Sequence, residues 1–94
     1  MTDILAITVD MKVYNGYIEY CRFTLGGGRQ DAEELFERLS GIADIGLALP
    51  LRLSLVNLSA APNEVLAIKY CRLDELAWNC RLITKEIFNH YNLG

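Results

Sequence analysis

Two segments of the chain alternate strictly between apolar residues and polar or small ones, and this pattern limits how the chain can fold. The first segment runs from Leu5 to Val13 and the second from Leu47 to Leu55, each with an apolar residue at every second position. Alternation with period two is typical of a β-strand that has one buried face. Each segment therefore predicts a strand in a sheet with one covered and one open face.

A hairpin is predicted directly after the first strand. The segment Tyr14–Tyr17 contains Asn-Gly, a pair that tolerates the positive φ angles of a two-residue hairpin turn. This register pairs Lys12 with Glu19 and Val13 with Ile18 across the two strands. Both pairs are favourable, because the first joins opposite charges and the second joins apolar side chains.

The second strand of this hairpin needs an irregularity. Alternation from Ile18 and Tyr20, taken as inward, would leave Phe23 outside the core. One extra residue in a strand exchanges the two faces beyond it. We therefore expect a β-bulge near Cys21-Arg22, which returns Phe23 and Leu25 to the core.

Two later segments predict helices. The first runs from about Gln30 to Ser40 and places four apolar residues on one stripe: Ala32, Leu35, Phe36 and Leu39. A fourth strand, from about Val65 to Leu73, precedes the second helix, in which Asp74 is expected to cap a segment from Glu75 to about Tyr91. The predicted core stripe of this second helix is Leu76, Cys80, Ile83, Ile87 and Tyr91.

The order strand, strand, helix thus occurs twice, and the two halves share a short sequence. Residues 18–23 and 68–73 have four identical positions, including Tyr-Cys-Arg, at a spacing of fifty residues. We interpret this match as an internal duplication of about 4–41 and 47–91 within one domain of residues 1–94. The expected fold is an α+β two-layer sandwich of order ββαββα, with a four-stranded antiparallel sheet and two helices on one face.

Pro50 bears on the order of the strands. Proline cannot donate a hydrogen bond to a neighbouring strand, so it favours an edge. With the third strand at an edge, the order 1-2-4-3 is preferred, and the two Tyr-Cys-Arg strands lie side by side in the centre. The alternative order 2-1-3-4 puts the third strand inside the sheet, where Pro50 would remove one ladder bond.

Composition excludes several classes of protein. Apolar residues make up 52% of the chain, which is incompatible with intrinsic disorder, and the net charge of −3 argues against nucleic acid and anionic membranes as partners. No apolar run approaches the roughly 18 residues of a membrane span, and Asp3 stands where a signal peptide would be basic. The three cysteines, Cys21, Cys71 and Cys80, form neither a disulfide framework nor a Cys-x-x-Cys motif. We therefore expect a cytoplasmic protein with no metal and no cofactor.

Few residues suggest catalysis. Gly26–Gly28 precede a helix, but the spacing of a phosphate-binding loop is absent, and no histidine lies near Cys21 or Cys71 in sequence to act as a base. One hypothesis nevertheless remains a small enzyme or ligand-binding domain. It would use this loop together with the side chains of the repeated motif: Tyr20, Arg22, Tyr70 and Arg72. The sequence names no ligand.

The second helix gives a stronger signal, because Trp78 and Leu82 fall opposite its core stripe. Outward apolar residues of this size are typical of a subunit contact. The preferred hypothesis is therefore a non-enzymatic binding or assembly module that forms a homodimer through Trp78 and Leu82. Alternatively, the Ile42–Leu49 connector covers these residues. The open sheet face is a further candidate contact, with Ala6, Thr8, Val56, Val65, Ala67 and Lys69.

Overall fold

The computed structural model describes residues 3–43 and 48–92, which contain four strands and two helices. In chain order these are β1 (Leu5–Val13), β2 (Gly16–Leu25), α1 (Arg29–Arg38), β3 (Leu51–Asn57), β4 (Glu64–Cys71) and α2 (Leu73–Asn92). The order ββαββα is the predicted one. Leu47, the predicted start of the third strand, lies outside the described residues.

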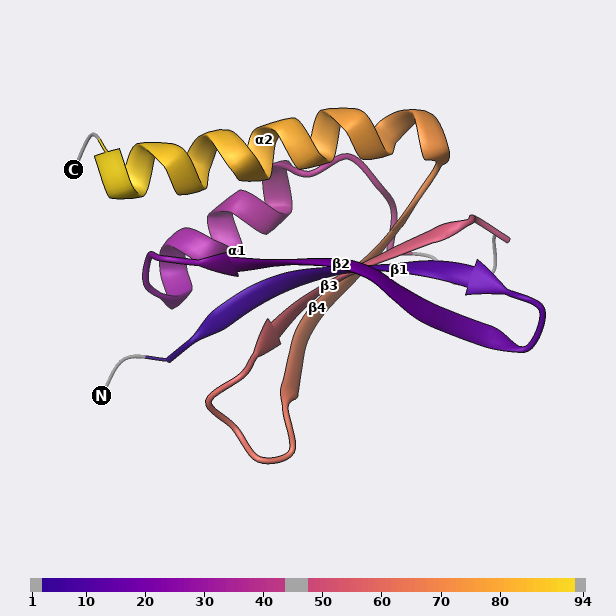
Figure 1. Cartoon of the computed structure of the whole chain (residues 1–94), viewed down its shortest axis with the longest axis horizontal. Coiled ribbons are helices and arrows are strands. Elements are labelled where there is room, and N and C mark those ends of the chain that lie inside the picture. Colours follow the sequence, from indigo (N-terminus) through magenta and orange to yellow (C-terminus); the bar gives the residue numbers. More distant parts are fainter. Residues whose placement is uncertain (1–2, 44–47, 93–94) are drawn as a thin grey trace.

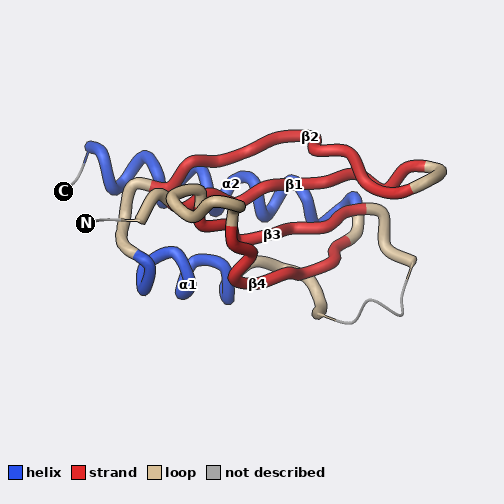
Figure 2. Tube along the Cα trace, turned by 90° about the horizontal axis from the view of Figure 1, so that it is seen from below, coloured by secondary structure: helices blue, strands red, loops and turns tan. Residues whose placement is uncertain are grey.

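The four strands form one antiparallel sheet with both helices on the same face, as Figure 1 shows. The α+β prediction is therefore confirmed. Figure 2 shows that α2 lies near the β2 edge of the sheet, whereas α1 lies near the β4 edge. The buried side chains between sheet and helices form one core: Leu5, Ile7, Val9, Leu25, Ala32, Leu35, Phe36, Leu39, Leu51, Leu53, Leu55, Cys71 and Ile83.

The strand order is β2-β1-β3-β4, so the preferred order 1-2-4-3 is wrong. Pro50 lies just before the first residue of β3. At this position the sheet does not need a backbone N–H as a hydrogen-bond donor, so the missing N–H of proline costs nothing. Its carbonyl oxygen still accepts a hydrogen bond of 2.8 Å from the Lys12 backbone N–H. The proline is therefore compatible with a central strand, and the two Tyr-Cys-Arg strands lie at opposite edges.

The two-residue turn of the first hairpin lies one residue earlier in the chain than predicted. Val13 pairs with Gly16, so the turn residues are Tyr14 and Asn15, and Lys12 pairs with Tyr17 rather than with Glu19. The predicted register is wrong by two residues along β2. Gly16 is the first residue of β2 and follows the turn directly. Its φ of +147° is a conformation that glycine adopts more readily than other residues.

A β-bulge interrupts the β1–β2 pairing, as predicted, but at Tyr20. Val9 pairs with Cys21 and Asp10 pairs with Glu19, which leaves Tyr20 without a partner. Tyr20 is exposed, contrary to the inward position expected for it. Beyond the bulge, Phe23 and Leu25 turn toward the core, which is the consequence that the sequence predicted.

Lys69 on β4 holds the end of α1, which stops at Arg38 rather than Ser40. Its ammonium nitrogen donates three hydrogen bonds, of 2.8 Å to Phe36 O and 2.9 Å to both Glu37 O and Leu39 O. The last carbonyls of a helix have no partner within the helix. A lysine from the neighbouring strand supplies that partner here, and α1 is thereby fastened to the sheet.

The second helix begins at Leu73, two residues before the predicted start. Glu75, rather than Asp74, performs the capping: its Oε1 accepts a 2.9 Å hydrogen bond from the Arg72 backbone N–H. This contact is the glutamate half of a capping box. Asp74 forms instead a surface ion pair with the Arg72 side chain, at 3.1 Å.

The internal duplication stays a prediction. The observed strand order is compatible with an approximate twofold between β1 and β3. However, Cys71 ends β4, whereas Cys21 is followed by four further residues of β2. Tyr20 is exposed in a bulge and Tyr70 is buried, so the two matching hexapeptides occupy dissimilar surroundings.

Candidate binding surface

The four residues of the ligand-binding hypothesis do not meet. Tyr20 and Arg22 lie on β2 and Tyr70 lies on β4, at opposite edges of the sheet. Arg22 pairs with Glu19 at 2.9 Å, and Arg72 lies at the start of α2. None of the four lines either of the clefts found in the described residues. The hypothesis of an enzyme built on the repeated motif thus lacks a common site.

One cleft, of about 340 Å³, lies between the glycine loop, α1 and the end of α2. A Cβ at Gly26 would come within 2.8 Å of His90 Nε2 and 2.9 Å of Tyr91 Cζ, so a larger residue there would require these two exposed side chains to move. Arg38 and Glu86 in its lining pair with each other at 3.1 Å. Within residues 3–43 and 48–92, no group of three potential ligands is arranged to hold a metal ion.

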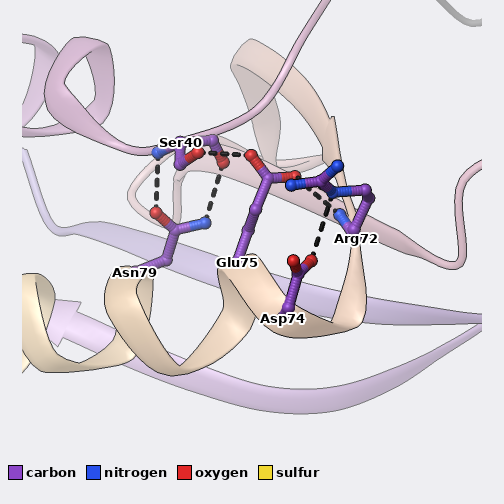
Figure 3. Close-up of polar contacts among 5 residues, drawn as sticks. All are labelled: Ser40, Arg72, Asp74, Glu75 and Asn79. Atoms are coloured by element: carbon purple, nitrogen blue, oxygen red, sulfur yellow. Dashed lines mark hydrogen bonds and ion pairs between the residues drawn. The ribbon is translucent and has the colours of Figure 1, made fainter.

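A polar cluster joins the end of α1 to the first turns of α2 (Figure 3). The buried Asn79 side chain accepts a 2.7 Å hydrogen bond from Ser40 N and donates one of 2.9 Å to Ser40 O. The Ser40 hydroxyl donates a hydrogen bond to Glu75 Oε2. This bond is the main cause of the lowered pKa of Glu75, and the hydrogen bond from the Arg72 backbone N–H is the second. All these groups are satisfied by one another, so the cluster fixes the two helices rather than presenting a reactive group.

The outer face of α2 is the most apolar exposed surface on either helix. Four large side chains of this helix remain open to solvent: Leu73 (65% exposed), Trp78 (54%), Phe88 (58%) and Tyr91 (67%). The predicted outward position of Trp78 is therefore confirmed. Leu82 was predicted outward as well, but it is partly buried against the core, and Tyr91 was wrongly placed in the core stripe.

Phe88 is the interface candidate that sequence reasoning missed. At about 100° per residue, Trp78 and Phe88 lie about 140° to either side of Ile83, which points into the core. The exposed cations Arg81 and Lys85 lie between them on the outward side. In the described part of the chain, neither of these two cations takes part in an ion pair. The outer face of α2 (Leu73, Trp78, Arg81, Lys85, Phe88 and Tyr91) is therefore apolar at both ends and positive in the middle.

The open face of the sheet is more polar. Arg52 donates to Asp10 Oδ2 from both Nε (3.1 Å) and Nη2 (2.9 Å), and its guanidinium lies 4.1 Å from the centre of the Tyr17 ring. Small residues beside this pair, among them Ala6, Thr8 and Ser54, are already buried. Its central charges are satisfied internally, so this face offers less to a partner than α2 does.

Two residues predicted for the open face lie on the other side. Ala67 packs against the core and Lys69 reaches α1, because a bulge at Leu66 changes the alternation along β4. Val56 and Val65 pair with each other on the open face, as expected. Of the Ile42–Leu49 connector, the alternative cover for Trp78 and Leu82, the structure describes residues 42–43 and 48–49. Its Ile42 pairs with Tyr70 through two backbone hydrogen bonds, of 2.9 Å and 2.6 Å, at the edge of β4.

The three cysteines have different surroundings. Cys21 on β2 and Cys80 on α2 are partly exposed, whereas Cys71 is fully buried. Burial raises the pKa of all three thiols, and that of Cys71 reaches about 11, with a further contribution from the Glu75 carboxylate. Thiols of raised pKa are weak nucleophiles at neutral pH, which argues against cysteine catalysis.

Comparison of the chain with protein-family models, with curated proteins and with solved structures finds no match. Among the described helices, α2 included, none has both the length and the apolarity needed to cross a membrane.

Proposed function

We propose that the protein is a small cytoplasmic binding or assembly module, not an enzyme, and that it acts as a homodimer through the outer face of α2. The observation that carries the proposal is the exposure of Leu73, Trp78, Phe88 and Tyr91 on one helix. Apolar surface gathered in this way is typical of protein contacts. The odd number of cysteines, without a disulfide framework, supports a reducing compartment.

The exposed area of the two aromatic side chains suffices for a weak dimer. An aromatic side chain has about 150–250 Å² of surface, so Trp78 and Phe88 each leave on the order of 100 Å² uncovered. Covering both residues in two copies removes about 400 Å² from water, which contributes about 10 kcal/mol at 25 cal/mol per Å². Association costs about 4–15 kcal/mol. At the low end of this cost the balance is about 6 kcal/mol, which corresponds to a dissociation constant of about 40 micromolar.

The spacing of these residues suits an antiparallel pair of helices. Trp78 and Phe88 are each five residues from Ile83, so a twofold axis at the level of Ile83 brings Trp78 level with Phe88 of the second copy. The same axis brings Arg81 level with Lys85 of the second copy. Two such like-charge pairs cost a few tenths of a kcal/mol each, which is small beside the apolar contribution.

The charge arrangement provides the test. Lys85→Glu turns both repulsive pairs into attractive ones, so it should strengthen the dimer by about 1–2 kcal/mol, or roughly tenfold in the dissociation constant. Lys12→Glu is the matched control, because Lys12 is an exposed lysine far from α2. Sedimentation velocity across a dilution series gives both constants. Tighter association of Lys85→Glu alone supports the proposal, and a wild type that stays monomeric at tens of micromolar overturns it.

A further inference from the structure

The outer edge of β2 has no neighbouring strand in the described part of the chain. β2 lies at one end of the sheet, where it pairs with β1 on its inner side. An edge strand presents a row of backbone N–H and C=O groups that can pair with a further strand. At the opposite edge, Ile42 already pairs with Tyr70 of β4 through two backbone hydrogen bonds. The sheet is therefore more open to extension at β2.

The bulge at Tyr20 decides which side chains of β2 share a face. In a regular strand, residues three positions apart point to opposite faces. Here Glu19 pairs with Asp10, and Arg22 pairs with Thr8. Thr8 and Asp10 are two positions apart on β1, so both belong to the open face of the sheet. The extra residue thus puts Glu19 and Arg22 on one face, where their side chains form an ion pair of 2.9 Å.

This arrangement makes β2 complementary to a second copy of itself. When a strand pairs antiparallel with its own copy, the twofold axis is perpendicular to the sheet, and each side chain stays on its own face. With the axis midway between Glu19 and Arg22, the glutamate of one copy lies opposite the arginine of the other. Ile18, which is 54% exposed in the single chain, likewise lies opposite Phe23 on the core face. Opposite charges and apolar side chains are both favourable cross-strand pairs.

We infer that a second copy of the chain pairs with the outer edge of β2 in this register, so that two four-stranded sheets become one continuous sheet. All ten residues of the strand overlap in this register. The neighbouring registers, centred on Tyr20 or on Cys21, put Glu19 opposite a side chain of the core face. The fit is between β2 and its own sequence, so the occupant is a second copy rather than an unrelated strand.

The edge contact is separate from the proposed contact through the outer face of α2. Both helices cover one face of the sheet, whereas strand pairing uses the backbone along its edge (Figure 2). Few side chains take part when two strands pair, and contacts that bury less than roughly 1,200 Å² are weak. We therefore expect the edge contact to form at higher concentrations than the α2 contact, approaching about 1 mM.

Charge exchange across the axis tests the register. In Trp78→Ala, which removes the anchor of the α2 contact, sedimentation equilibrium up to about 1 mM should show a dimer held by β2 alone. Adding Arg22→Glu surrounds the axis with four carboxylates and should weaken this dimer about tenfold. Combining Glu19→Arg with Arg22→Glu restores opposite charges across the axis, so association should return. Both residues are exposed, and circular dichroism verifies that each variant is folded.

Three results would overturn the inference. One is a Trp78→Ala chain that stays monomeric at about 1 mM. The second is a dimer that Arg22→Glu leaves unchanged, and the third is a double variant that associates as weakly as Arg22→Glu. Failure of the α2 contact gives a different result, because the wild type and Trp78→Ala would then associate alike at tens of micromolar.

Discussion

Replacing Lys69 by methionine should cost this domain a large part of its stability. The Lys69 ammonium donates three hydrogen bonds of 2.8–2.9 Å to the last carbonyls of α1 and lies 5.5 Å from the centre of the Phe36 ring. A hydrogen bond to a charged group contributes about 1.5–3 kcal/mol, but three on one group are not additive. Burial opposes them, since it is the main reason that the pKa of Lys69 is lowered. We expect a net loss of about 2–4 kcal/mol, because methionine keeps the apolar stem and removes only the donors.

Urea unfolding followed by far-ultraviolet circular dichroism measures this loss directly. With a denaturant slope of about 1–2 kcal/mol per molar, the midpoint should fall by about 2 M. Lys12→Met is the control and should stay within about 0.5 kcal/mol of the wild type, because Lys12 is exposed and forms no ion pair among the described residues. If Lys69→Met were as stable as Lys12→Met, the lysine would not be what fastens α1 to β4.

Three further outcomes follow from the geometry. Gly41→Ala should destabilise the fold by about 2–4 kcal/mol in the same urea assay, because Gly41 has a φ of +157° and an added Cβ would lie 2.9 Å from Tyr70 O. Gly28→Ala is the control and should be nearly neutral, because a Cβ at Gly28 would meet open space. The pKa of Glu75 is lowered in the folded state, so its contribution to stability is present above the ordinary value and is lost as the pH falls through the folded value. Melting curves of Glu75→Gln should accordingly show a weaker loss of stability below about pH 5 than those of the wild type. Cys71, whose pKa is about 11, should react with iodoacetamide only in unfolding conditions near neutral pH, and labelling of the folded chain would contradict its burial.

Alternation and helical spacing were sufficient to predict the elements. Leucine at every second position marks β3 because its inward side chains are all buried. The apolar stripe of α1 is buried for the same reason. Even the bulge in β2 was predictable, because Phe23 and Leu25 are too apolar to leave in solvent.

Strand order and register were not predictable from these patterns. Pro50 favours an edge strand only when it lies within the strand, but the β3 ladder starts one residue later, at Leu51. That difference removes the conflict and allows β3 to occupy the centre. A turn of two residues can likewise be placed at either of two positions around Asn15, and apolar alternation fits both.

The exposed outer face of α2 was only half predictable because of Asn79. A polar residue at this position indicates an exposed side chain, yet Asn79 is buried through its two hydrogen bonds to Ser40. Its burial rotates the inward face of α2 by part of a turn. Leu82 therefore lies nearer the core and Tyr91 farther from it than the apolar stripe indicates.

Sedimentation velocity of the wild-type chain at tens of micromolar tests most directly whether α2 forms a homodimer. We predict a species of twice the 10.6 kDa chain mass, shifted to the monomer when Trp78 is replaced by alanine, since losing one aromatic anchor in each copy weakens association by about 4 kcal/mol, or roughly a thousandfold. The dimer should tighten as salt is added, because ions screen Arg81 from Lys85 of the second copy. A wild type that sediments as a single 10.6 kDa species, or a dimer that Trp78→Ala leaves unchanged, would contradict the assignment of this face.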